Sequence, residues 1–418
     1  MTRQDLHAEL SKVLYIEDYN LVDTLLASVL ANSQKIGDPV WLTIIGASSA
    51  GKSQYIRPLA KSNPGLFLQV DDLTSNTLIS GNGEAQSLIF KIKEAGIISM
   101  DDLTVLMSKN AEDRNAILGQ LRMIYDGRMT KASGKSNGEG ITWQGHAGFI
   151  AGSTPSIYRF FADVADMGER FINYRMKDLD QDKAVDFVMR SGLSSKQMDE
   201  AIKDIYGRYF SALMPKVSAE RIPVDPKTQA AIINIAKAGT KLRTPVAVDD
   251  REYFVSEPVV PEMPFRVMKQ LDNLAKAFMV IHHAETGETE LPDDLRTAIE
   301  WVGYSLADDK RRAYFKAVIG LNQQMLKATV RNISAYTGLH HTAVERGMSV
   351  LSAIGVVRMN EEREGENQTR TWEVNDHRLK EIVKRIDPPK TVDADEYKDD
   401  EVGSYSEYPE SYQQPIPT

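Results

Sequence analysis

The sequence predicts an α/β fold: a core with a parallel sheet, then a helical region, a C-terminal helix-turn-helix unit and an acidic tail. Short apolar runs at 40–45, 65–70 and 97–100 alternate with segments of helical periodicity, as in βαβ units. Further helical patterns recur at 183–190, 196–214 and 226–238. Apolar periodicity is lost after Pro389. A chain of 418 residues has room for two or three domains.

Composition is ordinary for a soluble globular protein, with 42% hydrophobic and 26% charged residues. No apolar run approaches the roughly 18 residues of a membrane span. The first residues also lack the apolar core of a signal peptide. Because there is no cysteine, disulfides, zinc–thiolate sites and thiol catalysis are excluded. We expect an intracellular protein.

The net charge of −9 does not by itself indicate nucleic-acid binding. The charge is uneven, however, because residues 391–418 hold eight acids and one base and so contribute −7. Subtracting −7 from −9 leaves −2 on the rest of the chain, so basic surfaces remain possible there.

The chain begins with helical periodicity over 5–32, which predicts one or two packing helices. A glycine-rich motif of the pattern G-x-x-x-x-G-K-[ST] follows the apolar run 40–45 and precedes a helical segment at 54–60. Its residues are Gly46, Ala47, Ser48, Ser49, Ala50, Gly51, Lys52 and Ser53. The glycines let backbone N–H groups face phosphates, the lysine reaches the β- and γ-phosphates, and the serine hydroxyl suits Mg²⁺. The alternative is a chance match in a Ser/Gly loop.

A second group of candidate site residues ends the apolar run 97–100, which follows a polar stretch at 71–83 and a predicted helix at about 84–94. Asp101 would hold Mg²⁺ through water or Ser53, and Asp102 would orient and activate an attacking water. An apolar strand that ends in acids is common in α/β proteins, so the spacing from the glycine-rich motif carries the prediction.

A polar insertion follows a predicted helix at 105–125. Residues 128–145 read as a hairpin with Lys131 and Lys135 near its Gly/Ser tip. The next apolar strand, 146–152, ends in Ser153 and Thr154, at the edge of a parallel sheet where ligands bind. An ordinary surface hairpin is the alternative for residues 128–145.

In this order the parts resemble AAA+ ATPases, specifically the pre-sensor-1 hairpin branch of the minichromosome-maintenance (MCM) helicases. The sequence looks most similar to the MCM-like helicase ATPases of phages and mobile elements. The likeness covers roughly 38–312: Gly46 to Ser53 match Walker A, Ile97 to Asp102 match Walker B, and 128–145 match the pre-sensor hairpin. In the family this hairpin points lysines into a central channel.

The resemblance also implies roles for three further residues. Thr154 falls at the sensor-1 position, Arg170 at the arginine finger, and Arg266 at sensor 2 in a lid helix spanning 263–278, with a closing lid helix over 293–306. Two departures matter: Walker B usually ends Asp-Glu rather than Asp101-Asp102, and sensor 1 is usually Asn. The alternative for Arg170 and Arg266, as for Arg175 and Arg243, is that they are ordinary ion-pair partners.

The C-terminal region changes character. Helices at about 315–328 and 330–339, a turn at Gly338, a helix at 340–354 and two strands at 355–359 and 369–374 resemble a winged helix. DNA binding and protein docking both stay open, because the second helix of the motif carries one base, Arg346, and the strand connection is acidic. The pairs His282-His283 and His340-His341 do not share a helix face and predict no metal site.

The resulting division is 1–180 as an AAA+ core with N-terminal helices, 181–312 as a helical lid, 315–385 as a winged helix and 386–418 as a disordered acidic tail. The resemblance implies an ATP- and Mg²⁺-dependent DNA motor, a hexameric ring helicase on single-stranded or forked DNA. A replication protein would bind the winged helix or the tail. The resemblance also implies a cytoplasmic location, for a protein of a bacterial host or a virus-encoded one. The rival is an initiator, helicase loader or transposition regulator that switches without unwinding.

Overall fold

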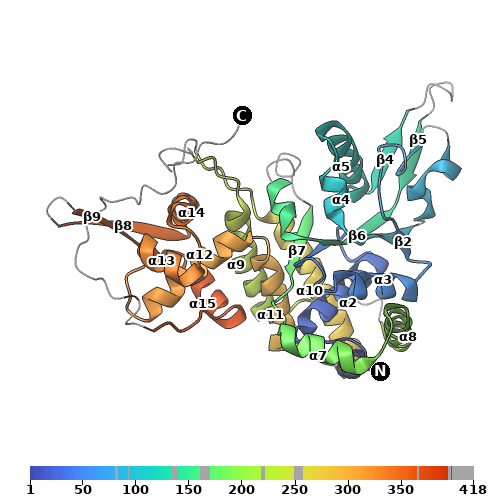
Figure 1. The fold of residues 1–418 in the computed structure, drawn as a ribbon. Helices are drawn as coiled ribbons and strands as arrows, with labels where there is room; N and C mark the ends of the chain where they lie inside the picture. The colour runs from blue at the N-terminus through green and yellow to red at the C-terminus, as the bar shows by residue number, and fades with distance from the viewer. Residues whose placement is uncertain are drawn as a thin grey trace, which may run out of the picture.

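The computed structural model describes residues 1–80, 83–92, 94–132, 140–160, 170–217, 222–248, 258–364, 367–393 and 397. It places an α/β core beside a helical layer and a separate C-terminal unit of helices and a long hairpin (Figure 1). None of the helices in these ranges has both the length and the apolarity needed to cross a bilayer. Residues 398–418, most of the expected acidic tail, lie outside the described residues.

The core is a five-stranded parallel sheet in the order β2-β3-β6-β1-β7. Its strands are β1 (Trp41–Ile45), β2 (Phe67–Gln69), β3 (Ala95–Met100), β6 (His146–Ser153) and β7 (Phe171–Arg175). From β1 the chain crosses to β2, returns through β3 and β6, and then places β7 on the other side of β1. Ligands of such sheets bind beyond the carboxyl ends of the strands where the order reverses, which here is the end of β1.

Helices cover both faces because successive residues of a strand point to opposite sides. Leu42 and Ile44 of β1 join the cluster formed with α2 (Tyr19–Ser33) and α3 (Lys52–Ser62). Trp41 and Ile45 join the cluster formed with the other helices. The helices and strands on that second side are α4 (Leu103–Met107), α5 (Ala111–Tyr125), β4 (Arg128–Lys131) and β5 (Ile141–Gln144).

Two sequence predictions in the core are wrong. The helix expected at 84–94 is a pair of 3₁₀ turns, η1 (Glu84–Gln86) and η2 (Leu88–Lys91). Between them the Ser87 hydroxyl accepts from the Ser80 N–H and donates to the Gly83 carbonyl, which competes with helical bonding. The helix expected at 105–125 is divided into α4 and α5, because the Asn110 side chain accepts from the Asp113 N–H and starts a new helix.

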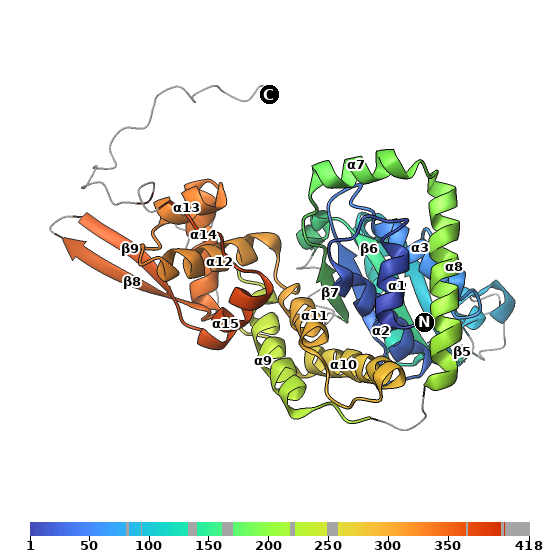
Figure 2. The same ribbon diagram turned by 90° about the horizontal axis from the view of Figure 1, so that it is seen from below.

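The helical region divides by packing. α8 (Ser195–Leu213) lies along α3 and α1 (Arg3–Leu10) of the core, and α7 (Gln181–Ser191) precedes it (Figure 2). α9 (Pro226–Arg243), α10 (Phe265–Thr286) and α11 (Asp293–Tyr304) pack on one another, and α10 and α11 also contact α2. Where α9 and α11 cross, a Cβ on Gly239 would lie 2.5 Å from the Gly303 carbonyl oxygen, so close helix contact depends on that glycine.

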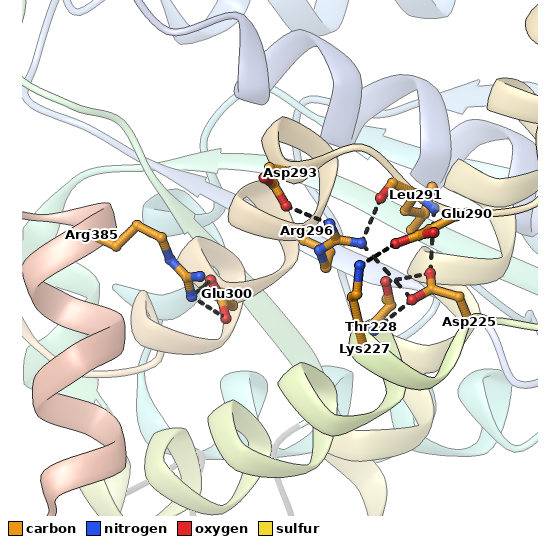
Figure 3. Close-up of polar contacts among 9 residues, drawn as sticks. All are labelled: Asp225, Lys227, Thr228, Glu290, Leu291, Asp293, Arg296, Glu300 and Arg385. Atoms are coloured by element: carbon orange, nitrogen blue, oxygen red, sulfur yellow. Dashed lines mark hydrogen bonds and ion pairs between the residues drawn. The ribbon is translucent and has the colours of Figure 1, made fainter.

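The helix expected at about 315–328 begins and ends earlier, as α12 (Asp309–Gln323). The C-terminal unit continues through α13 (Val330–Thr337), α14 (His341–Ala353), β8 (Val357–Glu364), β9 (Asn367–Val374) and α15 (His377–Ile386). Gly338, with φ of +71°, makes the turn between α13 and α14. α15 contacts α9 and α11, and Arg385 pairs with Glu300 of α11 through both carboxylate oxygens (Figure 3).

Candidate nucleotide-binding site

The glycine-rich motif lies between β1 and α3, as the sequence predicts. Gly51 has φ of +80° and Ser49 has φ of +63°, so the loop turns through two left-handed residues before the helix begins at Lys52. A side chain at Gly46 would force Met176 to move, because a Cβ would lie 2.8 Å from the Met176 sulfur. The Gly46 N–H donates to the Ser153 carbonyl at 3.1 Å, which joins the start of the loop to the end of β6.

The loop leaves a row of backbone donors at the helix N-terminus. Within the described residues, no protein acceptor takes the N–H groups of Ser48, Ser49, Gly51, Lys52 and Ser53. Exposed N–H groups and the positive end of the helix dipole together favour a bound anion. This backbone therefore fits a phosphate chain.

Lys52 lies inside the loop. Its ammonium donates to the carbonyl oxygens of Gly46 at 2.9 Å and Ala47 at 2.7 Å. Burial lowers the pKa of Lys52, nearby Arg175 lowers it further, and the carboxylate of Asp102 opposes them. The lysine, that aspartate and Arg175 therefore lie within electrostatic range of one another at the sheet edge.

The two strand-end carboxylates follow β3, but they have different partners. Asp101 pairs with the Nε of Arg57 on α3. Because Arg57 is four residues after Ser53, both lie on one face of α3, the face from which Arg57 reaches Asp101. Ser53 and Asp101 fit a Mg²⁺ site in which the ion also contacts phosphate oxygens. The described residues contain no group of three His, Asp or Glu side chains that could hold a metal by themselves.

Asp102 caps α4, since its carboxylate accepts from the Thr104 N–H at 2.9 Å. One carboxylate oxygen remains for another partner. The close approach of β3 and β6 beside it depends on Gly152, where a Cβ would lie 2.4 Å from the Asp101 carbonyl oxygen. The backbone that carries the two aspartates therefore runs directly beside the end of β6.

The hydroxyls at the end of β6 also differ. Ser153 is fully buried, and its hydroxyl lies 3.1 Å from that of Thr104. Thr154 is half-buried, and its hydroxyl lies 2.6 Å from that of Ser156. Thr154 therefore keeps the more accessible hydroxyl of the two at this edge.

Arg170 and Arg266 lie at the other end of the sheet. Arg170 precedes β7 and binds Asp126 at 3.1 Å, with its guanidinium 5.3 Å from the centre of the Tyr125 ring. Burial lowers the pKa of Arg170, and Arg266 contributes to the same shift, so the two arginines lie near each other. Within one copy of the chain the two arginines therefore lie away from the glycine-rich loop 46–53.

Of the two predicted DNA-binding lysines, the structure describes only Lys131. Lys131 ends β4, and its ammonium donates to the Ser75 carbonyl at 3.3 Å, the Asn76 side-chain oxygen at 2.9 Å and the Ile79 carbonyl at 3.0 Å. Lys131 thus anchors the 75–79 segment to the hairpin. Lys135 lies outside the described residues.

The C-terminal hairpin pairs its described arginines with acids. Arg358 lies 3.0 Å from Glu373, and Arg370 lies 3.1 Å from Glu361 and 3.6 Å from Glu345 of α14. His340 caps α14 through the Thr342 N–H, so it has a structural role there.

Residues that sequence reasoning missed lie around the loop. Arg57 had one usable signal, its four-residue spacing from Ser53. Arg175 was assigned only an ion-pair role, although it ends the strand next to β1 and its Nη1 donates to the Ile45 carbonyl at 3.4 Å. Its partner Asp309 and the neighbouring Arg312 are over 130 residues away in sequence, and no local pattern connects them to the loop.

Comparisons with known proteins add a distant likeness. No family model matches the sequence, and the comparison with curated proteins found no match. Among solved structures, the crystal structure of a "putative ATPase" from Cytophaga hutchinsonii is 14% identical, with a TM-score of 0.39. The match covers 73% of this chain and 85% of that one.

Proposed function

We propose that the chain is a Mg²⁺-dependent ATPase of the AAA+ type. One observation carries the proposal: a loop of unpaired N–H groups and Lys52 opens beside two strand-end carboxylates. The N–H groups and the ammonium favour a phosphate chain, and the carboxylates suit the cation that accompanies it. We assign ATP because the sequence resembles AAA+ ATPases.

Each residue then has a role at a stated atom. The Lys52 ammonium and the N–H groups of the loop bind the β- and γ-phosphate oxygens; these N–H groups are those of Ser48, Ser49, Gly51, Lys52 and Ser53. Mg²⁺, which neutralises developing charge on the phosphates, would be held by Ser53 and Asp101. The second oxygen of Asp102 accepts a proton from the attacking water, and the Thr154 hydroxyl orients that water.

The finer proposal is a DNA motor: a hexameric, MCM-like ring helicase on single-stranded or forked DNA. Arg170 and Arg266 would act on the nucleotide of the neighbouring subunit, because a head-to-tail interface can close into a ring. Lys131 and Lys135 would contact the phosphate backbone, a salt-sensitive and sequence-independent interaction. The C-terminal unit would be a winged helix that meets DNA or a replication protein.

A second candidate is a switch without unwinding, such as an initiator, helicase loader or transposition regulator. The contacts of Lys131 favour it, because all three of its donors are used by the 75–79 segment. The two arginines of the C-terminal hairpin whose side chains are described, Arg358 and Arg370, are also paired with acids, which reduces the positive charge that they offer to DNA.

The test is ATP turnover with and without single-stranded DNA. Lys52→Ala should abolish turnover, and Lys61→Ala, at the far end of the same helix, should preserve it. Loss of DNA stimulation in Lys135→Ala, together with strand displacement by the wild type, would support the motor. Turnover indifferent to DNA would favour the switch, and turnover that survives Lys52→Ala would refute the assignment of ATP hydrolysis to this loop.

The ring has its own test. Chains carrying Lys52→Ala and Arg170→Ala should each be inactive alone. Mixed assemblies should regain turnover, because a wild-type loop then meets a wild-type arginine at some interfaces. Absence of recovery in assemblies shown to be mixed would rule out Arg170 as a residue acting across subunits.

A further inference from the structure

Two arginines share one carboxylate beside the phosphate loop. Arg175, at the end of β7, places its Nε 2.9 Å from Oδ1 of Asp309, the first residue of α12. Arg312, one turn further along α12, places Nη2 2.6 Å from the same oxygen. Both arginine side chains are largely buried, with exposed fractions of 15% and 11%. This cluster therefore carries more positive than negative charge.

Arg175 is also close to Lys52. The Arg175 Nη1 donates to the Ile45 carbonyl at 3.4 Å, and Lys52 donates to the carbonyl of the next residue, Gly46. The Met176 N–H donates to the same Ile45 carbonyl at 2.8 Å and fixes the end of β7 against the start of the loop. Phosphates bound in the loop would thus lie within reach of a second cation from the same chain.

The surroundings leave the Arg175 guanidinium room to turn. A cavity of about 420 Å³ is lined by Arg175, Lys177, Trp301, Asp309 and Arg312, among others. The Trp301 indole donates to the Arg175 carbonyl at 2.7 Å and so holds the backbone while the side chain moves. The Arg312 guanidinium lies 5.6 Å from the centre of the Trp301 ring, so this ring would sense a change in the cluster.

We propose that Arg175 contacts the phosphates of a nucleotide bound to its own subunit, and that a triphosphate takes Arg175 from Asp309. This rests on the proposed function and adds a link from the nucleotide to the C-terminal unit. The exchange does not leave the Asp309 carboxylate without a cationic partner, because Asp309 keeps its ion pair with Arg312. Nucleotide binding then removes one of the contacts that hold α12 to the sheet.

The test compares two substitutions that break the same ion pair. In the full chain with Mg²⁺, Arg175→Gln should weaken ATP binding at least tenfold, and ADP binding less. Asp309→Asn should leave ATP binding unchanged or tighten it severalfold, because it frees Arg175 for the phosphates. A purely structural ion pair would make both substitutions weaken binding together. Arg175→Lys should recover part of the lost affinity.

Hydrogen exchange supplies the second readout. ATP should speed exchange at the start of α12 in the wild type, and Arg175→Gln should abolish that response. Two results would overturn this inference alone. One is equal weakening of ATP binding by Arg175→Gln and Asp309→Asn. The other is unchanged ATP binding in Arg175→Gln when Lys52→Ala shows that the wild type binds ATP through the loop. A wild type that binds neither nucleotide would overturn the proposed function as well.

Discussion

Arg385→Gln should destabilise the C-terminal unit in a pH-dependent way. Arg385 of α15 binds both oxygens of Glu300 in α11, at 2.5 and 2.6 Å (Figure 3). The Glu300 side chain is 5% exposed, whereas that of Arg385 is 58% exposed. The substitution therefore leaves a buried carboxylate without its guanidinium.

The magnitude follows from this asymmetry. Breaking a fully buried pair by removing one partner costs about 3–5 kcal/mol. Water reaches the exposed arginine, so the pair is weaker than that limit, and we expect a loss of about 1–3 kcal/mol at pH 7. Glu300→Gln should cost less, because it removes the charge that needs solvation and leaves the arginine in water.

The pKa of Glu300 determines how the loss of stability changes with pH. Burial raises the pKa of Glu300, and Arg385 lowers it, so Arg385→Gln raises it further. Below the raised pKa the carboxyl is neutral in the folded chain and the lost partner matters little. Above it the bare charge destabilises the fold, so the difference from wild type should grow as pH rises from 5 to 8.

The assay is urea unfolding followed by tryptophan fluorescence across that pH range. Trp372 in β9 reports the C-terminal unit. Lys384→Gln, on the same helix and paired with exposed Glu381, is the matched control and should change little. A loss in Arg385→Gln that is equal at pH 5 and pH 8, or matched by the control, would refute the reasoning.

Three further predictions concern the core. Gly152→Ala places a Cβ 2.4 Å from the Asp101 carbonyl oxygen, so it should lower the free energy of unfolding by about 1–3 kcal/mol and weaken ATP binding. The control, Gly119→Ala, has open space around the new methyl group and should raise the free energy of unfolding by about 0.5–1 kcal/mol in the same assay. Lys131→Ala should cost about 1 kcal/mol and speed hydrogen exchange at 75–79, and unchanged exchange there would contradict the anchoring role. Arg57→Gln frees the Asp101 carboxylate and should tighten Mg²⁺-dependent ATP binding severalfold in a Mg²⁺ titration; loss of Mg²⁺ dependence would contradict the assignment of Asp101.

The sheet was predictable because its strands are buried on both faces and read as apolar runs. All five residues of β1 are buried, and β3 and β6 are nearly as enclosed. The 3₁₀ turns at 84–91 were not predictable from apolar spacing, because the bonds of one side chain, Ser87, decide the local structure. The early start of α12 has a similar local cause, since Asp308 caps it through the Arg311 N–H.

The candidate site divides along the same lines. The positions of Lys52, Ser53, Asp101 and Asp102 in the fold were predictable, because the loop, the helix start and the strand end are each continuous in sequence. Arg175 was not, because its position beside the loop depends on the pairing of β7 with β1 across 130 residues. The sequence shows an arginine at the end of a strand, but it does not show which other strand lies beside that one.

The positions of Arg170 and Arg266 restrict what they can do. β7 runs parallel to β1, so Arg170 precedes the strand whose other end, Arg175, faces the phosphate loop. Five steps along the extended chain lead from one to the other, about 16 Å at roughly 3.3 Å per residue. An arginine side chain is too short to span that distance, and Asp126 and Tyr125 hold Arg170 at its own end. This geometry favours the proposed action of Arg170 on a nucleotide of another copy of the chain, and the proposed contact of Arg175 with a nucleotide of its own chain.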